Sequence, residues 1–522
     1  MAAFSKERQN ILFIMTDQQR ADYTSIYGCA APRTPAMDRI GAEGTVFRRA
    51  HVQAAVCGPS RACFYTGRYV HAHNSRWNEV PLRLTERTAG HYFEEAGYRA
   101  AVIGKTHMYA DHPKPDFVKE SSLTRDPRRL SRVDSVGFEY VAGGAWTPAV
   151  PPHAYIEYLR DRGYRGDGYR VISDAYYGYA PPSQPVAHPL RRPAILRAED
   201  SEAHYLTDRA IRFMRETADR PWFLHLSFFR PHHPNIASEP YNEMYPETDF
   251  PAPLRIEEEL RHPLFRELRA ERNAHMGPAE DAGYCRHWRA VYAGLIKEID
   301  DNLARLFDFM AKQDLLDRTL IVFTSDHGEL GGDHWFFEKE MCYRQSHQVP
   351  LLIRCPGCPG GILSDSFVES VDVLPTCLEA AGLPIPPAVQ GRSLLPLLRG
   401  ETPDDWRQDT CAEWTFEYYR AAREMGLPPE KCRALLLRNE AFSYCHFNGL
   451  PDLLFDLRRD PDELHNVAEE PAYERTLHAL KTRLLDWQLE TWDPIPLRID
   501  TGWPAKTGTG PKPEDMPYDF AR

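Results

Sequence analysis

Four short apolar segments, each followed at once by polar residues with reactive side chains, constrain the fold of this chain most. They cover residues 11–15, 100–103, 222–229 and 320–323. Continuous apolar runs of this length, separated by stretches with a helical pattern, are typical of strands buried on both faces of a mostly parallel sheet. Ligands of such sheets bind beyond the carboxyl ends of the strands. We therefore expect an α/β fold with its functional site at that edge.

Helices are predicted to cover this sheet at residues 85–96, 204–217 and 286–312, the last of which carries a periodic apolar stripe. Between residues 111 and 193 the composition changes to Tyr, Pro, Gly and Arg with little periodicity. Such a stretch indicates a loop-rich insertion, which we expect to form a wall of the substrate pocket.

Two domains and an arm are expected. Residues 1–398 form the α/β domain, and residues 399–494 form a smaller α+β subdomain. In the subdomain, short alternating stretches are followed by a helical pattern at 470–490, which predicts an antiparallel sheet with one packed helix; the stretches are 434–437, 442–447 and 453–457. Residues 495–522 are rich in Pro, Gly and Lys and cannot form a core of their own. We expect this arm to take part in a homo-oligomer, a dimer or tetramer.

Charge and cysteine usage narrow the classes of partner. The chain has 63 Lys and Arg against 75 Asp and Glu, a net charge of −12, which argues against nucleic acid or a membrane surface as partner. The apolar run at 11–15 is too short for a signal-peptide core or a membrane span. Eleven scattered cysteines suit a reducing compartment. We therefore expect a cytoplasmic location.

The most specific stretch runs from Cys57 to Arg68 and reads C-G-P-S-R-A-C-F-Y-T-G-R. It resembles the signature of the sulfatase family, C-x-P-S-R followed by T-G-R. The resemblance implies that a formylglycine-generating enzyme oxidises Cys57 to formylglycine, an aldehyde whose hydrate is the nucleophile. The hydrate carries two hydroxyls on one carbon, so one can attack sulfur and the other can then release sulfate. The alternative is that Cys57 is a small buried apolar residue beside a turn.

Two strand ends carry residues suited to a divalent cation: Asp17-Gln18 and Asp326-His327. Such an ion would lower the pKa of the attacking hydroxyl and hold the substrate oxygens. In the resembling family the corresponding strand-end residues bind one divalent ion. Oxygen ligands with one histidine suit Ca²⁺ or Mn²⁺ ahead of Mg²⁺. We therefore expect a metal site whose ligands are Asp17, Gln18, Cys57, Asp326 and His327.

The same resemblance covers other polar strand ends. Gly104-Lys105-Thr106-His107 is similar to the family's G-K-x-H, which implies that Lys105 neutralises substrate charge and His107 takes a proton from the hydrate. Arg230-Pro-His-His-Pro is similar to P-H-x-P, so His232 is expected to protonate the leaving group or bind sulfate, with His233 as the alternative.

Three more residues complete the expected site. Lys339, downstream of the metal motif, would hold a non-bridging oxygen of the substrate, and Arg61 would brace the hydrate. Asn78, after a tryptophan, would donate to a substrate oxygen; the alternative is that it caps a turn.

Motifs that resemble those of the sulfatase family extend from residue 10 to about residue 470. The implied fold is that of the alkaline phosphatase superfamily, with a central, mostly parallel sheet flanked by helices and a C-terminal antiparallel-sheet subdomain. The implied activity is that of an arylsulfatase-like hydrolase of sulfate monoesters with promiscuous side activities.

Two alternatives stay open. A phosphonate monoester or phosphodiester hydrolase of the same mechanism is favoured by the Asp-Gln and Asp-His metal pairs, although in that branch Tyr and Thr replace the lysine and histidine kept here as Lys105 and His107. The second alternative is a non-catalytic binding protein whose Cys57 is never converted.

Overall fold

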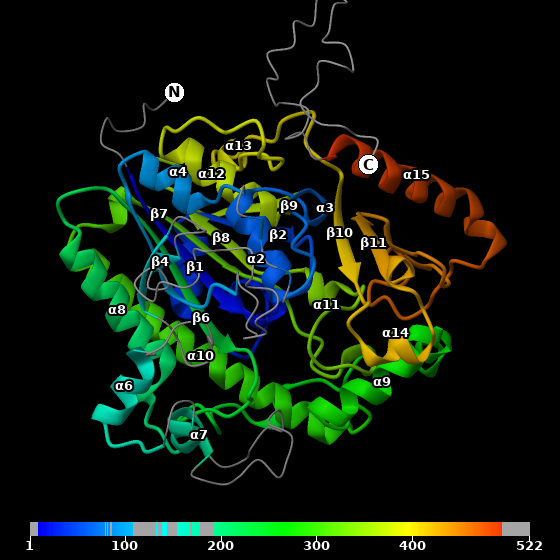
Figure 1. The fold of residues 1–522 in the computed structure, drawn as a ribbon, viewed down its shortest axis with the longest axis horizontal. Coiled ribbons are helices and arrows are strands. Elements are labelled where there is room, and N and C mark those ends of the chain that lie inside the picture. The colour runs from blue at the N-terminus through cyan, green and yellow to red at the C-terminus, as the bar shows by residue number, and fades with distance from the viewer. Residues whose placement is uncertain are drawn as a thin grey trace, which may run out of the picture.

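In the computed structural model, the described residues are 9–107 without 79, 81, 84 and 85, then 132–133, 138–142, 154–166, 170–177 and 193–492. Within them, nine strands form one sheet in the order β4-β5-β3-β6-β1-β7-β8-β2-β9 (Figure 1). The strands are β1 Asn10–Asp17, β2 Thr45–His51, β3 Arg99–Gly104, β4 Arg132–Val133, β5 Phe138–Ala142, β6 Trp222–Pro231, β7 Thr319–Ser325, β8 Leu351–Arg354 and β9 Ile362–Glu369.

The four apolar segments predicted as strands are β1, β3, β6 and β7, and they lie next to one another in parallel. The mostly parallel α/β sheet is therefore confirmed. The register aligns the carboxyl ends: Thr16 of β1 pairs with Ser325 of β7, and Asp17 pairs with Pro231 of β6. Gln18, His232 and Asp326 consequently follow their strands at one edge of the sheet.

Helices cover both faces of the sheet (Figure 1). Alternate residues of β1 point to opposite faces, so that Leu12 and Ile14 join one apolar core and Ile11, Phe13 and Met15 join the other. Helices of the first core are α1 Pro35–Ala42, α6 Ala154–Asp161, α7 Arg170–Tyr177, α8 Glu202–Glu216 and α10 Ala282–Lys312. Those of the second core are α2 Cys57–Thr66, α4 Ala89–Glu95, α12 Val373–Ala380 and α13 Leu395–Leu398.

The helices predicted at 204–217 and 286–312 are α8 and α10, with ends within four residues of the prediction. The one predicted at 85–96 is shorter: α4 begins at Ala89, after Thr88, whose backbone and side chain both bond the His91 ring. A side chain that satisfies the free N–H groups of the first turn sets the start of a helix.

The stretch at 111–193, expected to be loop-rich, includes regular elements in its described residues. It contains the strands β4 and β5, with β5 parallel to β3, and the helices α6 and α7. Tyr155, Leu159 and Ile172 of these helices are fully buried in the first core. Tertiary packing of a few apolar side chains stabilises short helices that have weak periodicity in the sequence. The rest of this stretch lies outside the described residues.

The smaller sheet is antiparallel, as predicted, with the order β10-β11-β12-β13. Its strands are β10 Asp409–Thr415, β11 Arg433–Asn439, β12 Phe442–Phe447 and β13 Leu453–Asp456. The predicted helix is α15, Glu474–Glu490. The connections also contain α9 Pro263–Met276 and the short helices α3 Val70–His73, α11 Arg344–His347 and α14 Arg420–Glu424. The arm at 495–522 is outside the described residues. Among the described residues, no helix is both long and apolar enough to cross a bilayer.

Trp487 of α15 joins the two parts of the chain. Its side chain is 3% exposed, and its ring meets those of Tyr69 and His71 edge-on at 5.2 and 5.1 Å. His71 belongs to α3, which follows α2.

We expect Trp487→Ala to lower the free energy of unfolding by about 3–5 kcal/mol, because it leaves a large buried cavity. Denaturant unfolding measures this. Trp492→Ala is the matched control, since Trp492 is 68% exposed, and its effect should stay within about 0.5 kcal/mol. Equal effects of the two substitutions would contradict the docking of α15.

Candidate active site

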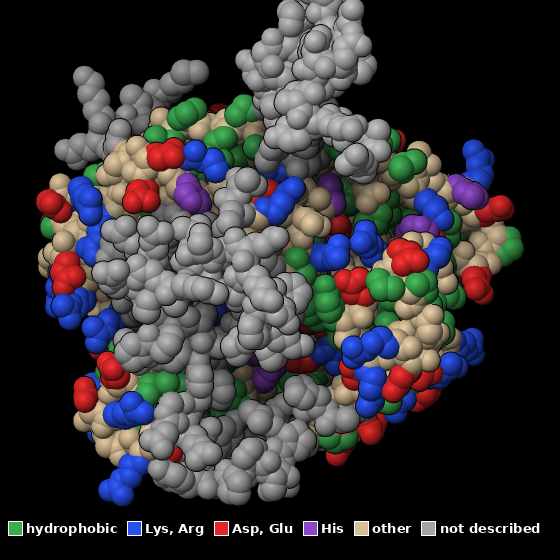
Figure 2. All heavy atoms as spheres, in the orientation of Figure 1, with side chains coloured by type: hydrophobic (Ala, Val, Ile, Leu, Met, Phe, Trp, Pro, Cys, Tyr) green, Lys and Arg blue, Asp and Glu red, His purple; other side chains and the backbone are tan. Residues whose placement is uncertain are grey.

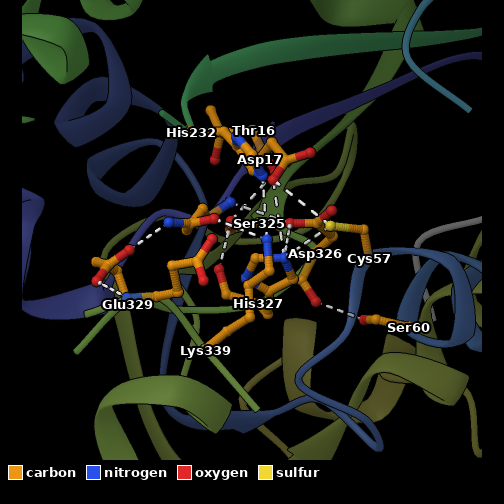
Figure 3. Close-up of polar contacts among 12 residues, drawn as sticks. Thr16, Asp17, Cys57, Ser60, His232, Ser325, Asp326, His327, Glu329 and Lys339 are labelled. Atoms are coloured by element: carbon orange, nitrogen blue, oxygen red, sulfur yellow. Dashed lines mark hydrogen bonds and ion pairs between the residues drawn. The ribbon is translucent and has the colours of Figure 1, made fainter. Parts of the chain in front are cut away.

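Four side chains from three separate parts of the chain converge beyond the carboxyl ends of β1 and β7 (Figure 3). One ligand atom from each of Asp17, Cys57, Asp326 and His327 lies within 4.8 Å of the others, and all four residues are buried. The Cys57 Sγ is 3.1 Å from Nε2 of His327 and 3.9 Å from Oδ1 of Asp17. The structure thus brings together four of the five predicted metal ligands.

Cys57 is the first residue of α2, and its side chain is 1% exposed. Burial alone would raise the pKa of its thiol, but the charges of Lys105, Lys339 and His327 hold that pKa well below its usual range. A low thiol pKa of this origin marks an electropositive, anion-binding pocket. An ordinary buried cysteine gives the opposite shift, as Cys63 shows on the same helix, where burial raises the thiol pKa.

The predicted substrate residue Asn78 lies against the start of α2. Its Oδ1 accepts a 2.8 Å hydrogen bond from the N–H of Gly58. A Cβ atom at position 58 would lie 3.2 Å from the Asn78 Cα, so glycine permits this close approach. The Asn78 oxygen therefore binds the backbone beside Cys57. The amide nitrogen of Asn78 is the group that would donate to a substrate.

Arg61, which is expected to brace the hydrate, contacts both carboxylates of the predicted metal site. Its Nε donates to Oδ2 of Asp326 at 2.8 Å and one terminal nitrogen donates to Oδ2 of Asp17 at 3.2 Å. The other terminal nitrogen donates to the Lys105 carbonyl at 2.8 Å and to the Ser227 hydroxyl at 2.7 Å. The guanidinium therefore braces the two carboxylates rather than the Cys57 side chain. A planar donor fork suits this bidentate task better than an ammonium group does.

Asp17 is the most strongly paired carboxylate of the site. Burial would raise the pKa of its carboxyl, and the neighbouring Cys57 acts in the same direction, but Lys105, His232 and Arg61 together hold it well below its usual range. The Lys105 ammonium forms a close ion pair with Oδ2 of Asp17. Lys105 thus lies within the site, where its charge balances a predicted metal ligand.

The turn after β3 presents both Lys105 and His107. Gly104 has φ +105°, and a Cβ there would lie 1.8 Å from the Ser227 carbonyl oxygen, so only glycine fits. His107 has φ +52°, and its ring hydrogen-bonds the Cys57 sulfur. A left-handed conformation at a histidine aims the ring into the site at some conformational cost.

Lys339 is a second cation of the site, and it contacts His232 and Gln18. The Lys339 ammonium donates to Nε2 of His232 at 3.0 Å and to Oε1 of Gln18 at 2.9 Å. The His232 Nδ1 lies 2.8 Å from the His233 carbonyl, to which it donates, so Nε2 is the acceptor that faces Lys339. Burial, followed by the Lys339 charge, lowers the His232 pKa. His233, the alternative, instead lies 3.4 Å from the carboxylate of Glu338.

The donor set fits one hard divalent cation. Two carboxylates and an imidazole are ligands that Ca²⁺ or Mn²⁺ accepts. Gln18 lies beside them, and its backbone N–H donates to Oδ1 of Asp326 at 3.0 Å. Glu329 and Ser227 also lie in the site and are not among the residues predicted from the sequence. The only signal for Glu329 is the motif S-D-H-G-E, which begins at the last residue of β7.

Comparisons with known proteins identify the family of the chain. The sulfatase family profile matches residues 9–383, and a profile described as "N-sulphoglucosamine sulphohydrolase, C-terminal" matches residues 332–490. The chain belongs to the sulfatase family, within the alkaline phosphatase superfamily, and it is a hydrolase acting on sulfate or phosphonate esters.

Individual relatives fall into both branches. The chain is 36% identical, over 93% of its length and 96% of the relative's, to "Multifunctional alkaline phosphatase superfamily protein PehA" of Trinickia caryophylli. It is 27% identical to an N-acetylglucosamine-6-O-sulfatase of Bacteroides thetaiotaomicron, with 95% and 89% covered. The solved phosphonate monoester hydrolase of Silicibacter pomeroyi superposes with a TM-score of 0.82 at 32% identity, covering 93% and 96%.

We expect Arg61→Ala to lower the free energy of unfolding of the metal-free protein by about 3–5 kcal/mol, because Asp17 and Asp326 lose their buried partner. Chemical denaturation in the presence of a chelator measures this. Arg39→Ala, which breaks an ion pair whose side chains are 42% and 38% exposed, should cost less than about 1 kcal/mol. A loss at Arg61 as small as that at Arg39 would contradict its bracing role.

Proposed function

We propose that this protein hydrolyses sulfate monoesters, in the manner of an arylsulfatase, through a formylglycine hydrate derived from Cys57. The convergence of Lys105, His107 and Lys339 on Cys57, together with the nearby donors Asp17, Asp326 and His327, supports this proposal. Cations and a metal site around Cys57 suit a tetrahedral anion, whose oxygens gain charge as the ester bond breaks.

A formylglycine hydrate at position 57 would supply one hydroxyl that attacks sulfur once its proton is lost to solvent, and a second hydroxyl whose deprotonation expels sulfate and restores the aldehyde. The Lys339–His232 pair would give the departing alcohol its proton as the bond from sulfur to the alcohol oxygen breaks. His107 would take the proton of the second hydroxyl. A Ca²⁺ or Mn²⁺ ion held by Asp17, Gln18, Asp326 and His327 would lower the pKa of the attacking hydroxyl.

Maturation is part of the proposal. Cys57 is 1% exposed at the start of a buried helix, so a formylglycine-generating enzyme can reach it only before the chain has folded. Assembly into a dimer or tetramer through the arm at 495–522, and a cytoplasmic location, stay predictions.

Phosphonate monoester hydrolysis is the second candidate. The Asp-Gln and Asp-His pairs at the metal site and the identity of 32% to the Silicibacter hydrolase favour it. Lys105 and His107 favour the sulfate ester, because in the hydrolase branch Tyr and Thr occupy these two positions. The two activities share one mechanism, so the two candidates differ only in which ester has the higher kcat/KM.

Cys57→Ala should abolish turnover of an aryl sulfate, with a loss of about 10³-fold or more, because the nucleophile is gone. Cys63→Ala is the matched control on the same helix: its thiol is also buried but lies 3.4 Å from His73, away from the metal site, and most of the activity should remain. Equal losses would refute the assignment of the nucleophile.

The choice between esters is tested with an aryl sulfate, an aryl phosphonate monoester and an aryl phosphodiester assayed side by side. The parent protein should cleave the sulfate with the highest kcat/KM, and chelation should remove all three activities until Ca²⁺ or Mn²⁺ is added.

The double substitution Lys105→Tyr with His107→Thr should lower kcat/KM for the sulfate by about 10²–10³-fold, because a cation and a proton acceptor are lost. The phosphonate rate should fall by less than about tenfold. Equal losses on both substrates, or a parent protein that prefers the phosphonate, would favour the second candidate.

A further inference from the structure

The side-chain amide of Gln18 is held from both ends by partners that leave it one orientation. Its Oε1 accepts from the Lys339 ammonium at 2.9 Å, and its Nε2 donates to Oε2 of Glu329 in a short hydrogen bond. An ammonium group only donates and a carboxylate only accepts. The oxygen of Gln18 therefore faces Lys339 and the nitrogen faces Glu329.

Glu329 also binds the backbone next to Lys339. Its second oxygen, Oε1, accepts from the N–H of Gly331 at 2.8 Å and from the N–H of Glu338 at 2.6 Å. Glu338 precedes Lys339 in sequence and has φ +68°, a conformation that a non-glycine residue adopts only where its surroundings enforce it. The Glu329 side chain is fully buried and takes part in the polar contacts drawn in Figure 3.

One buried carboxylate thus fixes two parts of the site at once, a predicted metal ligand and the backbone next to a predicted substrate-binding lysine. We propose that Glu329 is a positioning residue that presents the Gln18 oxygen, and not its nitrogen, to the cations of the site, and so sets the affinity for the divalent metal. Outer partners of this kind orient the ligands of a metal in many proteins, and their loss weakens binding.

The substitution Glu329→Gln separates this role from space filling. The new amide has one oxygen, which accepts the hydrogen bonds from the N–H groups of Gly331 and Glu338. The nitrogen of the new amide then faces the side-chain nitrogen of Gln18, and no hydrogen bond forms between them. The Gln18 amide must then turn, which brings its nitrogen to the Lys339 ammonium. The double substitution Gln18→Glu with Glu329→Gln reverses donor and acceptor, so the hydrogen bond forms again and an oxygen faces Lys339.

The test is calorimetric titration of Ca²⁺ and Mn²⁺ into the metal-free, full-length protein. We expect Glu329→Gln to raise the dissociation constant by about 10–100-fold. The double variant should recover affinity to within about tenfold of the parent. Glu463→Gln is the matched control: Glu463 is also fully buried and accepts the N–H of Arg344 and the Arg438 guanidinium, and its variant should bind the metal as the parent does.

Either of two results overturns the inference: binding by Glu329→Gln within twofold of the parent, or a double variant that binds no more tightly than Glu329→Gln. If Glu329→Gln does not fold, Glu329→Asp replaces it. Its shorter carboxylate cannot reach Gln18 and both N–H groups together, so affinity should fall several-fold, and unchanged affinity would refute the role.

The inference rests on the proposed metal site, but its test needs neither formylglycine nor turnover. A parent protein that binds neither ion contradicts both the metal site and the role of Glu329. A parent that binds metal, together with a Glu329→Gln variant that binds equally well, contradicts the role of Glu329 alone.

Discussion

The buried guanidinium of Arg61 holds together two carboxylates that would otherwise repel each other in the protein interior. Asp17 is the last residue of β1 and Asp326 follows β7, and both side chains are fully buried. Burial of two like charges is strongly unfavourable unless cations compensate them. Arg61 and Lys105 supply that compensation from α2 and from the turn after β3. The same arrangement leaves the two carboxylates poised, on the side of Cys57 and His327, for a divalent cation.

The sheet positions this cluster, and its strands could be predicted from the sequence only where both of their faces are buried. The central strands β1, β3, β6 and β7 are buried on both faces, so their continuous apolar runs identify them. Strands β2 and β9 lack such a run, because Arg48 is exposed in β2 and Leu363 is 61% exposed in β9. Strand β9 lies at the edge of the sheet and β2 lies between β8 and β9, so partial exposure interrupts the apolar run in both.

The candidate site was predictable as far as the strand ends and the Cys57 motif allowed. Residues that act through their own side chains, such as Lys105, His232 and Lys339, follow predicted strands or known motifs. The contacts of Arg61 with the two carboxylates could not be predicted, because they depend on how α2 crosses the strand ends. Glu329 could not be predicted as a partner of Gln18, because their contact needs a loop that returns to place the Glu338 N–H against the same carboxylate. Local motifs carry no information on such long-range pairing.

The central claim is that Cys57 is the precursor of the nucleophile, and the mass of one peptide tests it most directly. The tryptic peptide that contains Cys57 is weighed from protein made with and without a formylglycine-generating enzyme, and aryl sulfate turnover is measured on the same samples. The account predicts a peptide in which one oxygen replaces the sulfur and two hydrogens, in a fraction that rises with turnover. Unmodified cysteine in fully active protein, or conversion without any esterase activity, would contradict it.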